Sequence, residues 1–269
     1  MRKPGRWTES VDADNLPNAM GSAGRVFLRP LVTAIAALLL AGATQAATAD
    51  PETTARRDMV RTIEVIAREN SGGAIPTTLD AGVLEAMRRV PRHAFVPAAQ
   101  RELAYTNRPL PIGYGQTISQ PYIVALTTDL LRVAQRSRAL EIGTGSGYQA
   151  AVLADLGYQV YTIEIVAELA EQAGKRLSEL GYNAVHARHG DGYYGWPEAA
   201  PFDGIVVTAA ASQIPPPLLE QLKPGGRMVI PIGAAFLVQQ LMLIEKLADG
   251  SIRTEALLPV AFVPLAGRH

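Results

Sequence analysis

Residues Arg138–Gln149 read RALEIGTGSGYQ, and this stretch decides the fold. The apolar residues before the first glycine predict a buried parallel strand, and Tyr148–Leu156 (YQAAVLADL) predicts a helix. Three glycines, Gly143, Gly145 and Gly147, lie between these two elements. Glycine adopts positive φ at low cost, and its missing side chain lets a ligand approach the backbone N–H groups at a helix start. Strand, glycine turn and helix together predict the first unit of a nucleotide-binding α/β domain.

Two acidic residues near this loop bear on the identity of the cofactor. Dinucleotide-binding loops favour the spacing G-x-G-x-x-G, in which a pyrophosphate lies on the helix N-terminus. Here the third glycine comes one residue early, and Glu141 lies just ahead of the first glycine. A carboxylate there repels a pyrophosphate but suits the ammonium group of an amino acid. Glu164 closes the next apolar run, where an acceptor for a ribose diol belongs. The loop and both acids favour S-adenosylmethionine (S-adenosyl-L-methionine) over NAD; a purely structural glycine turn is the alternative.

Composition and charge argue against several classes of function. The chain has 269 residues, 48% of them hydrophobic, and equal numbers of basic and acidic residues, 25 of each. A formal net charge of zero gives no sign of a nucleic-acid surface. The absence of cysteine excludes disulfides, thiolate nucleophiles and cysteine-ligated zinc, and the four histidines lack metal-ligand spacing. We therefore expect no nucleic-acid partner, no metal and no histidine-dependent hydrolase.

The N-terminal segment has the features of a targeting sequence. Residues 31–49 carry no charge, two arginines precede them, and small residues lead up to Ala49. The apolar centre has the length of a signal-peptide core and is short for a membrane span. We expect cleavage near Ala49 and a periplasmic or secreted product. The alternatives are a membrane anchor, with transient membrane contact through residues 31–49, and a cytoplasmic protein. We divide the chain into this segment, 1–49, and a single domain, 50–269, and expect a monomer.

The chain before the glycine loop predicts a helical cap followed by a long loop. Ala55–Glu69 and Leu79–Val90 carry apolar residues at helical spacing, so we expect two helices packed on the sheet domain. Pro91–Pro121 is rich in proline and glycine and lacks periodicity. A segment of this length without regular structure is typical of a functional loop. We therefore divide the domain into 55–121, the cap and substrate loop, and 122–269, the cofactor-binding sheet.

The end of this long loop offers uncharged polar groups. Gln116–Gln120 reads QTISQ, and its hydroxyl and amide groups, with the neighbouring backbone N–H groups, can hold an anionic carboxylate. Another role for Ser119 is to cap a helix over Tyr122–Leu131, with Pro121 in its first turn. Both roles are compatible, because a helix N-terminus is itself an anion site.

After the glycine loop, strands and helices alternate as in a doubly wound domain. We expect helices at Val166–Leu180, with Leu180 facing inward, and at Pro217–Leu222. The expected strands are Val160–Ile163, Ala184–Ala187, Asp203–Thr208, Arg227–Pro231, and a closing antiparallel pair, Gln239–Lys246 and Ala256–Val263.

Five motifs follow one another along the chain: FVP, AYTNRPLPIGYGQTISQPYIVA, EIGTGSGYQAAVLA, RHGDGYYGWPEAAPFDGIVVTAAA and QLKPGGRMVIPIG. In this order they resemble the protein-L-isoaspartate (D-aspartate) O-methyltransferase family. The match runs from about Asp58 to Leu265. The glycine loop is common to methyltransferases in general, whereas the PIGxGQTIS pattern is specific to this family.

The resemblance implies a fold and an activity. The fold is α/β, a Rossmann-like S-adenosylmethionine-dependent methyltransferase with a seven-stranded, mostly parallel sheet and an N-terminal helical cap. The activity is methyl transfer to the α-carboxylate of L-isoaspartyl residues, less readily D-aspartyl residues, in damaged proteins or peptides. The methyl ester then collapses to a succinimide, which initiates repair. The alternatives are a methyltransferase of small carboxylic acids and a non-catalytic binding protein for damaged envelope proteins.

The resemblance also assigns roles to individual residues. Thr117 and Ser119 are the expected catalytic residues, which orient the carboxylate, and Gln116 and Ile118 contact the substrate. Asn107 departs from the acidic residue that family members often carry, and we expect it to shape the loop. Asp191 is assigned to the adenine ring, with a plain turn residue as the alternative. The expected cofactor-binding residues are Glu141, Gly143, Thr144, Gly145, Gly147, Glu164, Asp191 and Gly192.

Overall fold

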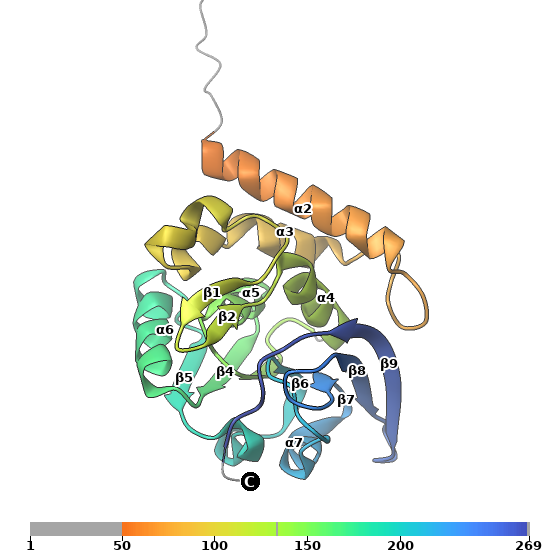
Figure 1. The fold of residues 1–269 in the computed structure, drawn as a ribbon. Helices are drawn as coiled ribbons and strands as arrows, with labels where there is room; N and C mark the ends of the chain where they lie inside the picture. Colours follow the sequence, from red (N-terminus) through yellow and green to blue (C-terminus); the bar gives the residue numbers. More distant parts are fainter. Residues whose placement is uncertain (1–49, 133, 268–269) are drawn as a thin grey trace, which may run out of the picture. The chain divides into compact units, whose positions relative to one another are not determined.

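A seven-stranded sheet runs through the part of the chain that the computed structural model describes, residues 50–132 and 134–267 (Figure 1). Ala49–His269 forms one compact unit. The predicted targeting segment lies outside the described residues. The strand order is β5-β4-β3-β6-β7-β8-β9. The strands are β3 (Arg138–Ile142), β4 (Gln159–Glu164), β5 (Val185–His189), β6 (Phe202–Val207), β7 (Leu222–Ile232), β8 (Gln239–Lys246) and β9 (Ile252–Val260).

The pairing of these strands creates a switch point at the centre of the sheet. Strands β5, β4, β3, β6 and β7 are parallel, whereas β8 and β9 continue the sheet antiparallel. The chain proceeds from β3 through β4 to β5 on one side and then returns to β6 on the other side of β3. Open α/β sheets bind ligands beyond the carboxyl ends of the strands at such a point. The predicted seven-stranded, mostly parallel sheet is confirmed.

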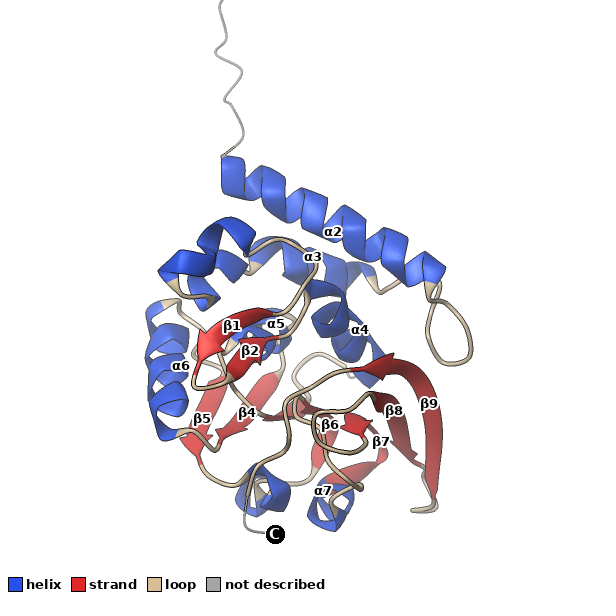
Figure 2. Cartoon of the chain, in the orientation of Figure 1, coloured by secondary structure: helices blue, strands red, loops and turns tan. Residues whose placement is uncertain are grey.

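Alternation along the strands gives the sheet two apolar faces, each covered by helices (Figure 2). On β3, Ala139 packs with the helices of one face, whereas Leu140 and Ile142 belong to the core of the other. The first face is covered by α4 (Pro121–Leu131), α5 (Tyr148–Asp155) and α6 (Ala167–Glu179). The second is covered by α7 (Pro216–Gln221) and the 3-10 helices η3 (Gly192–Tyr194) and η4 (Pro197–Ala199).

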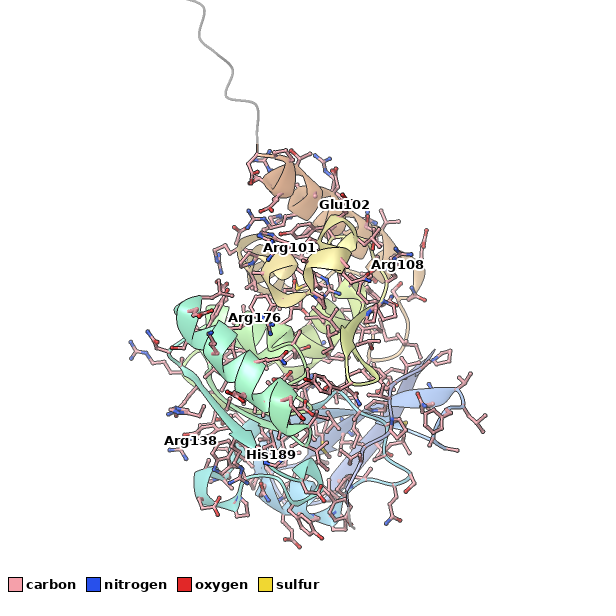
Figure 3. All side chains as sticks on the ribbon, turned by 60° about the vertical axis from the view of Figure 1, so that its left-hand side comes forward. Arg101, Glu102, Arg108, Arg138, Arg176 and His189 are labelled. Carbon is pink, nitrogen blue, oxygen red and sulfur yellow. The ribbon has the colours of Figure 1, made fainter. Side chains whose placement is uncertain are left out.

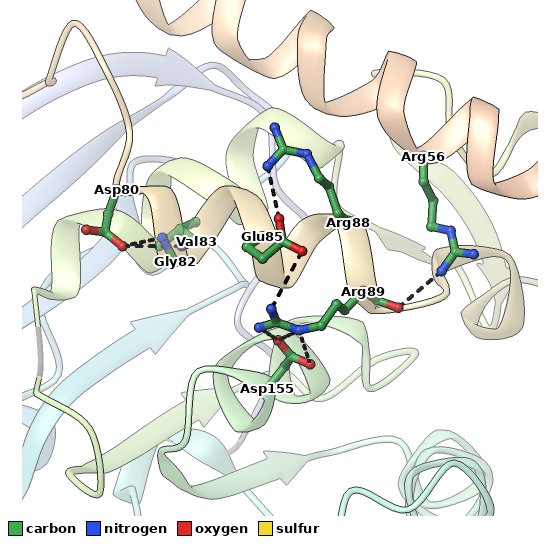
Figure 4. Close-up of polar contacts among 8 residues, drawn as sticks. All are labelled: Arg56, Asp80, Gly82, Val83, Glu85, Arg88, Arg89 and Asp155. Atoms are coloured by element: carbon green, nitrogen blue, oxygen red, sulfur yellow. Dashed lines mark hydrogen bonds and ion pairs between the residues drawn. The ribbon is translucent and has the colours of Figure 1, made fainter.

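The helical cap consists of α2 (Pro51–Glu69) and α3 (Ala81–Arg89), and polar contacts anchor it to the domain (Figure 4). Asp80 caps α3 by accepting hydrogen bonds from two backbone N–H groups of its first turn. Arg89, at the end of α3, pairs with Asp155 at the end of α5, with Nε 3.0 Å from Oδ2. Arg56 donates to the backbone carbonyl of Arg89 at 3.2 Å. These contacts join both cap helices to the element that follows the glycine loop.

The long loop before α4 has regular structure, contrary to expectation. It contains two 3-10 helices and a short antiparallel hairpin, whose strands span a few residues each. Such short elements are held by local hydrogen bonds, so they produce no apolar periodicity that a sequence pattern could reveal. The elements are η1 (Arg92–Phe95), η2 (Ala98–Leu103), β1 (Leu110–Gly113) and β2 (Gln116–Ile118).

Several boundaries also differ from the expected ones. Leu180 follows the end of α6 and is 39% exposed, so its predicted inward position is wrong. Strand β7 begins at Leu222 rather than at the expected Arg227, because residues 224–226 form a bulge opposite β6 and do not interrupt the pairing. No helix among residues 50–132 and 134–267 is both long and apolar enough to cross a membrane.

Candidate active site

Three clefts open beyond the carboxyl ends of the central strands, and they share two residues. The register pairs Ile142 of β3 with Ile163 of β4 and with Val207 of β6, so the residues that follow these strands lie side by side. Thr117 and Thr208 line all three clefts. We name them the outer cleft, the strand-end cleft and the glycine-loop cleft.

The clefts differ in size and lining. The outer cleft, about 480 Å³, has an apolar wall from the end of β9 and the segment after it, and Ser119 on its polar side. The strand-end cleft is smaller and lies against Gly143, Glu164 and Gly192. Its other residues include Gln116 and Gly145. The glycine-loop cleft is lined by Ile118, Ser119, Glu141, Gly143, Thr144, Gly145, Ser146 and Gln149, among others.

The glycine loop is held tightly by its neighbours. Gly143 has φ 95°, and a Cβ atom built on it would lie 2.5 Å from Oγ1 of Thr208. The Thr208 hydroxyl lies 2.7 Å from the carbonyl oxygen of Gly143. On the other side, Arg176 of α6, labelled in Figure 3, donates to the carbonyl of Ser146 at 2.8 Å. Only glycine fits the first position of this loop, both for its dihedral angle and for the close approach of Thr208.

Glu141 is a buried carboxyl group with an unused oxygen. Its exposed fraction is 1%, and burial raises its pKa to about 8, with the charge of Glu164 as a smaller contribution. The Thr162 hydroxyl donates to Oε2 at 2.7 Å, whereas Oε1 has no hydrogen-bond partner. A buried carboxyl group with a free acceptor beside a cleft fits a cationic or hydrogen-bond-donating ligand group. This geometry agrees with the ammonium-binding role predicted for Glu141.

Glu164 already accepts two backbone hydrogen bonds. Gly145 N donates to its Oε2 at 2.7 Å, and Val166 N donates to its Oε1 at 3.0 Å. A carboxylate has about four acceptor positions, so capacity for ribose hydroxyls remains. Glu164, the last residue of β4, therefore links the glycine loop to the strand-end cleft.

Of three other predicted cofactor residues, one lines a cleft and two do not. Gly192 lines the strand-end cleft and packs so closely on Ile142 that a Cβ atom would clash with it. Asp191 lines none of the three clefts; its side chain accepts from Tyr193 N at 3.0 Å and caps η3. Gly147, with φ 87°, also lies outside the clefts and packs against Leu177 of α6. The third glycine of the loop is thus favoured by its left-handed backbone conformation and by its close packing against α6.

Arg92 holds the long loop before α4 in place, and the sequence pattern did not single out this residue. Its side chain is fully buried, donating from Nε to the carbonyl of Ala104 at 2.8 Å and from Nη2 to the carbonyl of Ser119 at 2.7 Å. The guanidinium carbon lies 4.8 Å from the ring centroid of Tyr148, the first residue of α5. Burial lowers the Arg92 pKa to about 10. Arg92 therefore connects Ser119 to the helix that follows the glycine loop.

The predicted capping role of Ser119 is wrong. Gln120 occupies the N-cap position of α4 and makes no side-chain cap hydrogen bond. Instead, Asn107 reaches across from the long loop and accepts from Tyr122 N at 2.9 Å. The Ser119 side chain is thereby left to line the outer and glycine-loop clefts. The expectation that Asn107 shapes the loop is consistent with this contact.

Two further lining groups come from parts of the chain that sequence reasoning did not single out. Thr208 directly follows β6, so its position at a strand end was a usable signal. The segment 263–266 returns across the strand ends through a bridge between Ala210 and Pro264, for which the sequence offers no local signal. Among residues 50–132 and 134–267, no three histidine, aspartate or glutamate side chains lie close enough to hold a metal ion.

Fold and site together define a class: an α/β methyltransferase with its ligand clefts at the strand switch point. Residues 64–269 match the family model of protein-L-isoaspartate(D-aspartate) O-methyltransferase. The chain belongs to this family.

Individual relatives agree with this assignment. The chain is 63% identical over 231 residues to protein-L-isoaspartate O-methyltransferase 2 of Syntrophobacter fumaroxidans, covering 86% of this chain and 94% of that protein. It is 56% identical over 253 residues to protein-L-isoaspartate O-methyltransferase 1 of Cupriavidus necator, covering 94% and 97%.

Solved structures show the same fold. One protein-L-isoaspartate O-methyltransferase superposes with TM-score 0.70 and 28% identity, covering 79% of this chain and 66% of that one. A Plasmodium falciparum structure, described as a beta-aspartate methyltransferase in complex with S-adenosyl-L-homocysteine, gives TM-score 0.64 and 25% identity. That match covers 81% of this chain and 99% of the other.

Proposed function

We propose that this chain is an S-adenosylmethionine-dependent protein-L-isoaspartate O-methyltransferase acting in protein repair. Family membership supports the reaction class. The observation that carries the assignment to this site is the meeting of three clefts at Thr117 and Thr208. A transferase needs both substrates bound with their reacting atoms adjacent, and a junction between an inner and an outer cleft supplies such a place.

The strand-end and glycine-loop clefts, here called the inner clefts, are lined by groups that suit the chemistry of the methyl donor. The unpaired oxygen of Glu141 would hold the ammonium group, the backbone of Gly143 and Gly145 would lie along the ligand, and Glu164 would accept from the ribose hydroxyls. When bound, S-adenosylmethionine supplies a methyl group carried on a sulfonium sulfur. The sulfur departs as a neutral thioether, so no protein acid is needed to assist the leaving group. Thr144 and Ser146 of the glycine loop are themselves buried beside this cleft.

The chain's own residues need only orient the acceptor. A carboxylate is ionised at neutral pH, so methylation requires no strong general base. The Ser119 and Thr117 side chains, between the outer and inner clefts, would hold the α-carboxylate of an isoaspartyl residue by hydrogen bonds. The resulting methyl ester would lose methanol when the following backbone nitrogen attacks it, which gives the succinimide.

The outer cleft favours a peptide over a free small acid. Its volume, about 480 Å³, and its apolar wall of Leu258, Pro259 and Phe262 exceed what a small dicarboxylic acid needs. The chain of a damaged protein can fill this volume on both sides of the modified residue. This comparison favours isoaspartyl peptides over small free acids as substrates.

Replacing Ser119 tests the assignment. In the full chain, Ser119→Ala should lower kcat on an isoaspartyl peptide by about ten- to a hundredfold, because the carboxylate loses its orienting donor. The Kd for S-adenosylmethionine should change less than twofold. Ser178→Ala, on the exposed side of α6, is the matched control and should keep wild-type kinetics. Equal losses in kcat and cofactor affinity would contradict the role of Ser119, and wild-type activity on small acids alone would contradict the function.

A further inference from the structure

Three consecutive apolar side chains stand exposed at the rim of the outer cleft. Phe236, Leu237 and Val238 lie in the turn between β7 and β8, and their exposed fractions are 87%, 65% and 73%. Val238 also lines the outer cleft, together with Ser119. We name residues 236–238 the apolar loop. Exposed apolar groups next to a binding cleft mark an interaction surface more often than scattered single residues do.

Hydrogen bonds hold the apolar loop in this outward position. Phe236 has φ 62°, a left-handed conformation that non-glycine residues seldom adopt, and Leu237 N donates to the carbonyl of Ala234 at 3.3 Å. Gln239, 2% exposed, accepts from Phe262 N at 2.7 Å. Its Nε2 lies 3.4 Å from the carbonyls of both Ala234 and Phe262. Since Phe262 lines the outer cleft, Gln239 ties the apolar loop to the cleft wall.

We propose that the apolar loop binds an apolar side chain of the substrate polypeptide, close in sequence to its isoaspartyl residue. This inference rests on the proposed function, because it takes the outer cleft as the peptide site. A polypeptide with its carboxylate at Ser119 would leave the outer cleft past Val238 and reach Phe236 and Leu237. The loop would therefore favour isoaspartyl sites in apolar segments, which damaged and partly unfolded proteins expose.

Two other occupants fit the loop less well. Surfaces that bind anionic lipid combine apolar residues with lysine or arginine, whereas residues 233–240 read GAAFLVQQ and carry no basic residue. A stable contact between two copies of the chain buries roughly 800 Å² on each partner, far more than three side chains provide. Substrate peptide remains the occupant that the continuity with the outer cleft supports.

A peptide pair tests the proposal with the full chain. Both peptides carry one L-isoaspartyl residue; leucines flank it in the first, and serines in the second. The enzymes compared are wild type, the double variant Phe236→Ser with Leu237→Ser, and the control Leu180→Ser, which removes an exposed apolar side chain from the end of α6. Thermal unfolding of each variant establishes that it is folded before kinetics are measured.

We expect the wild type to have a KM about five- to tenfold lower for the leucine peptide, as partial burial of one leucine side chain provides. The double variant should lose this preference because its KM for the leucine peptide rises. Its kcat and its KM for the serine peptide should stay unchanged. Leu180→Ser should retain the preference. A preference that survives in the double variant would overturn the proposal.

Two further results separate this proposal from its rivals. Binding to vesicles of phosphatidylglycerol and phosphatidylcholine that the double variant loses, without any change in peptide preference, would assign the loop to a membrane and overturn the proposal. A wild type that methylates neither peptide would contradict the proposed function itself, and the inference with it. A wild type that methylates both peptides with equal KM would contradict only the inference.

Discussion

At the scale of single residues, Glu141 and Arg92 show what the site requires in its interior. Each is fully buried and ionisable, and each retains one buried polar atom without a partner. Glu141 lines a cleft, whereas Arg92 uses its other nitrogens to hold the backbone of the long loop that ends at Ser119. The acid is thus free to bind a ligand, and the base positions the residue that would orient the acceptor.

The protonation of Glu141 predicts a pH-dependent stability. Its pKa is about 8 in the folded protein because of burial, against 4.5 as the ordinary value. Between these values the native state holds a proton that the unfolded chain has lost. The free energy of unfolding therefore falls as pH rises through this window, by up to about 1.4 kcal/mol per pH unit from this group.

Denaturant unfolding of wild type and Glu141→Gln at pH 5.5, 6.5 and 7.5, without cofactor, measures this contribution. The glutamine is isosteric with the protonated acid and does not titrate, so the stability difference in favour of the variant should grow with pH. A difference independent of pH would show that Glu141 titrates normally. The variant should also bind S-adenosylmethionine more weakly, which equilibrium binding at pH 7.5 measures.

Arg92 illustrates why part of the site escaped the sequence. It follows Pro91 in a stretch without periodicity, where an arginine reads as a solvated surface residue. Its burial depends on η1, η2 and the start of α5 meeting around it, which is a tertiary property. Glu141 and Glu164, by contrast, stand at the ends of apolar runs, and a strand end in a parallel sheet is predictable from local pattern.

At the scale of elements, close packing of the glycine loop predicts that two glycines with similar φ respond differently to replacement by alanine. Gly143 and Gly157 have φ 95° and 86°, but a Cβ atom at Gly143 would clash with Thr208, whereas at Gly157 the nearest atom is 4.0 Å away. Gly157→Ala should cost about 1–2 kcal/mol from its dihedral angle alone. Gly143→Ala should cost more and should also abolish cofactor binding.

Denaturant unfolding and equilibrium cofactor binding on both alanine variants check this contrast. Equal destabilisation, with cofactor binding retained in Gly143→Ala, would show that the contact with Thr208 does not constrain the loop. The comparison isolates steric fit because both substitutions add the same methyl group at nearly the same φ.

Elements with strong periodicity were predicted well, and short irregular ones were not. The expected strand at Val160–Ile163 lies inside β4, and the expected helix at Tyr148–Leu156 matches α5 within one residue. The hairpin of β1 and β2 lies in the loop expected to be without regular structure, because strands of four and three residues are too short to show a pattern in the sequence. The last strand, β9, lies earlier than expected because it pairs at the sheet edge and is exposed along much of its length, so it lacks the apolar signal.

At the scale of the whole molecule, the clefts are assembled from segments far apart in the chain. Thr117, Glu141, Thr208 and Val263 come from the hairpin, the first central strand, the end of β6 and the C-terminal segment. The order of motifs along the sequence indicated the family, but only the folded chain brings Thr208 and the C-terminal segment to the junction.

The N-terminal region carries a prediction about location. We expect export with cleavage near Ala49, as proposed from the uncharged residues 31–49. The mature chain would then begin at Asp50, whose side chain accepts from Glu52 N and caps α2. Fractionation of cells, with the N-terminus of the protein read by mass spectrometry, tests this. An uncleaved chain in the cytosol would contradict export and leave the proposed activity untouched.

The most direct test of the proposed activity is methyl transfer to two isomeric peptides. Full-length protein and methyl-labelled S-adenosylmethionine are incubated with a peptide containing L-isoaspartate, and separately with the same peptide containing L-aspartate. We predict base-labile label on the isoaspartyl peptide alone, since only there does the aspartyl residue carry a free α-carboxylate, its main chain continuing through the β-carboxyl group. Equal labelling of both peptides, or label on neither despite measurable cofactor binding, would contradict the account.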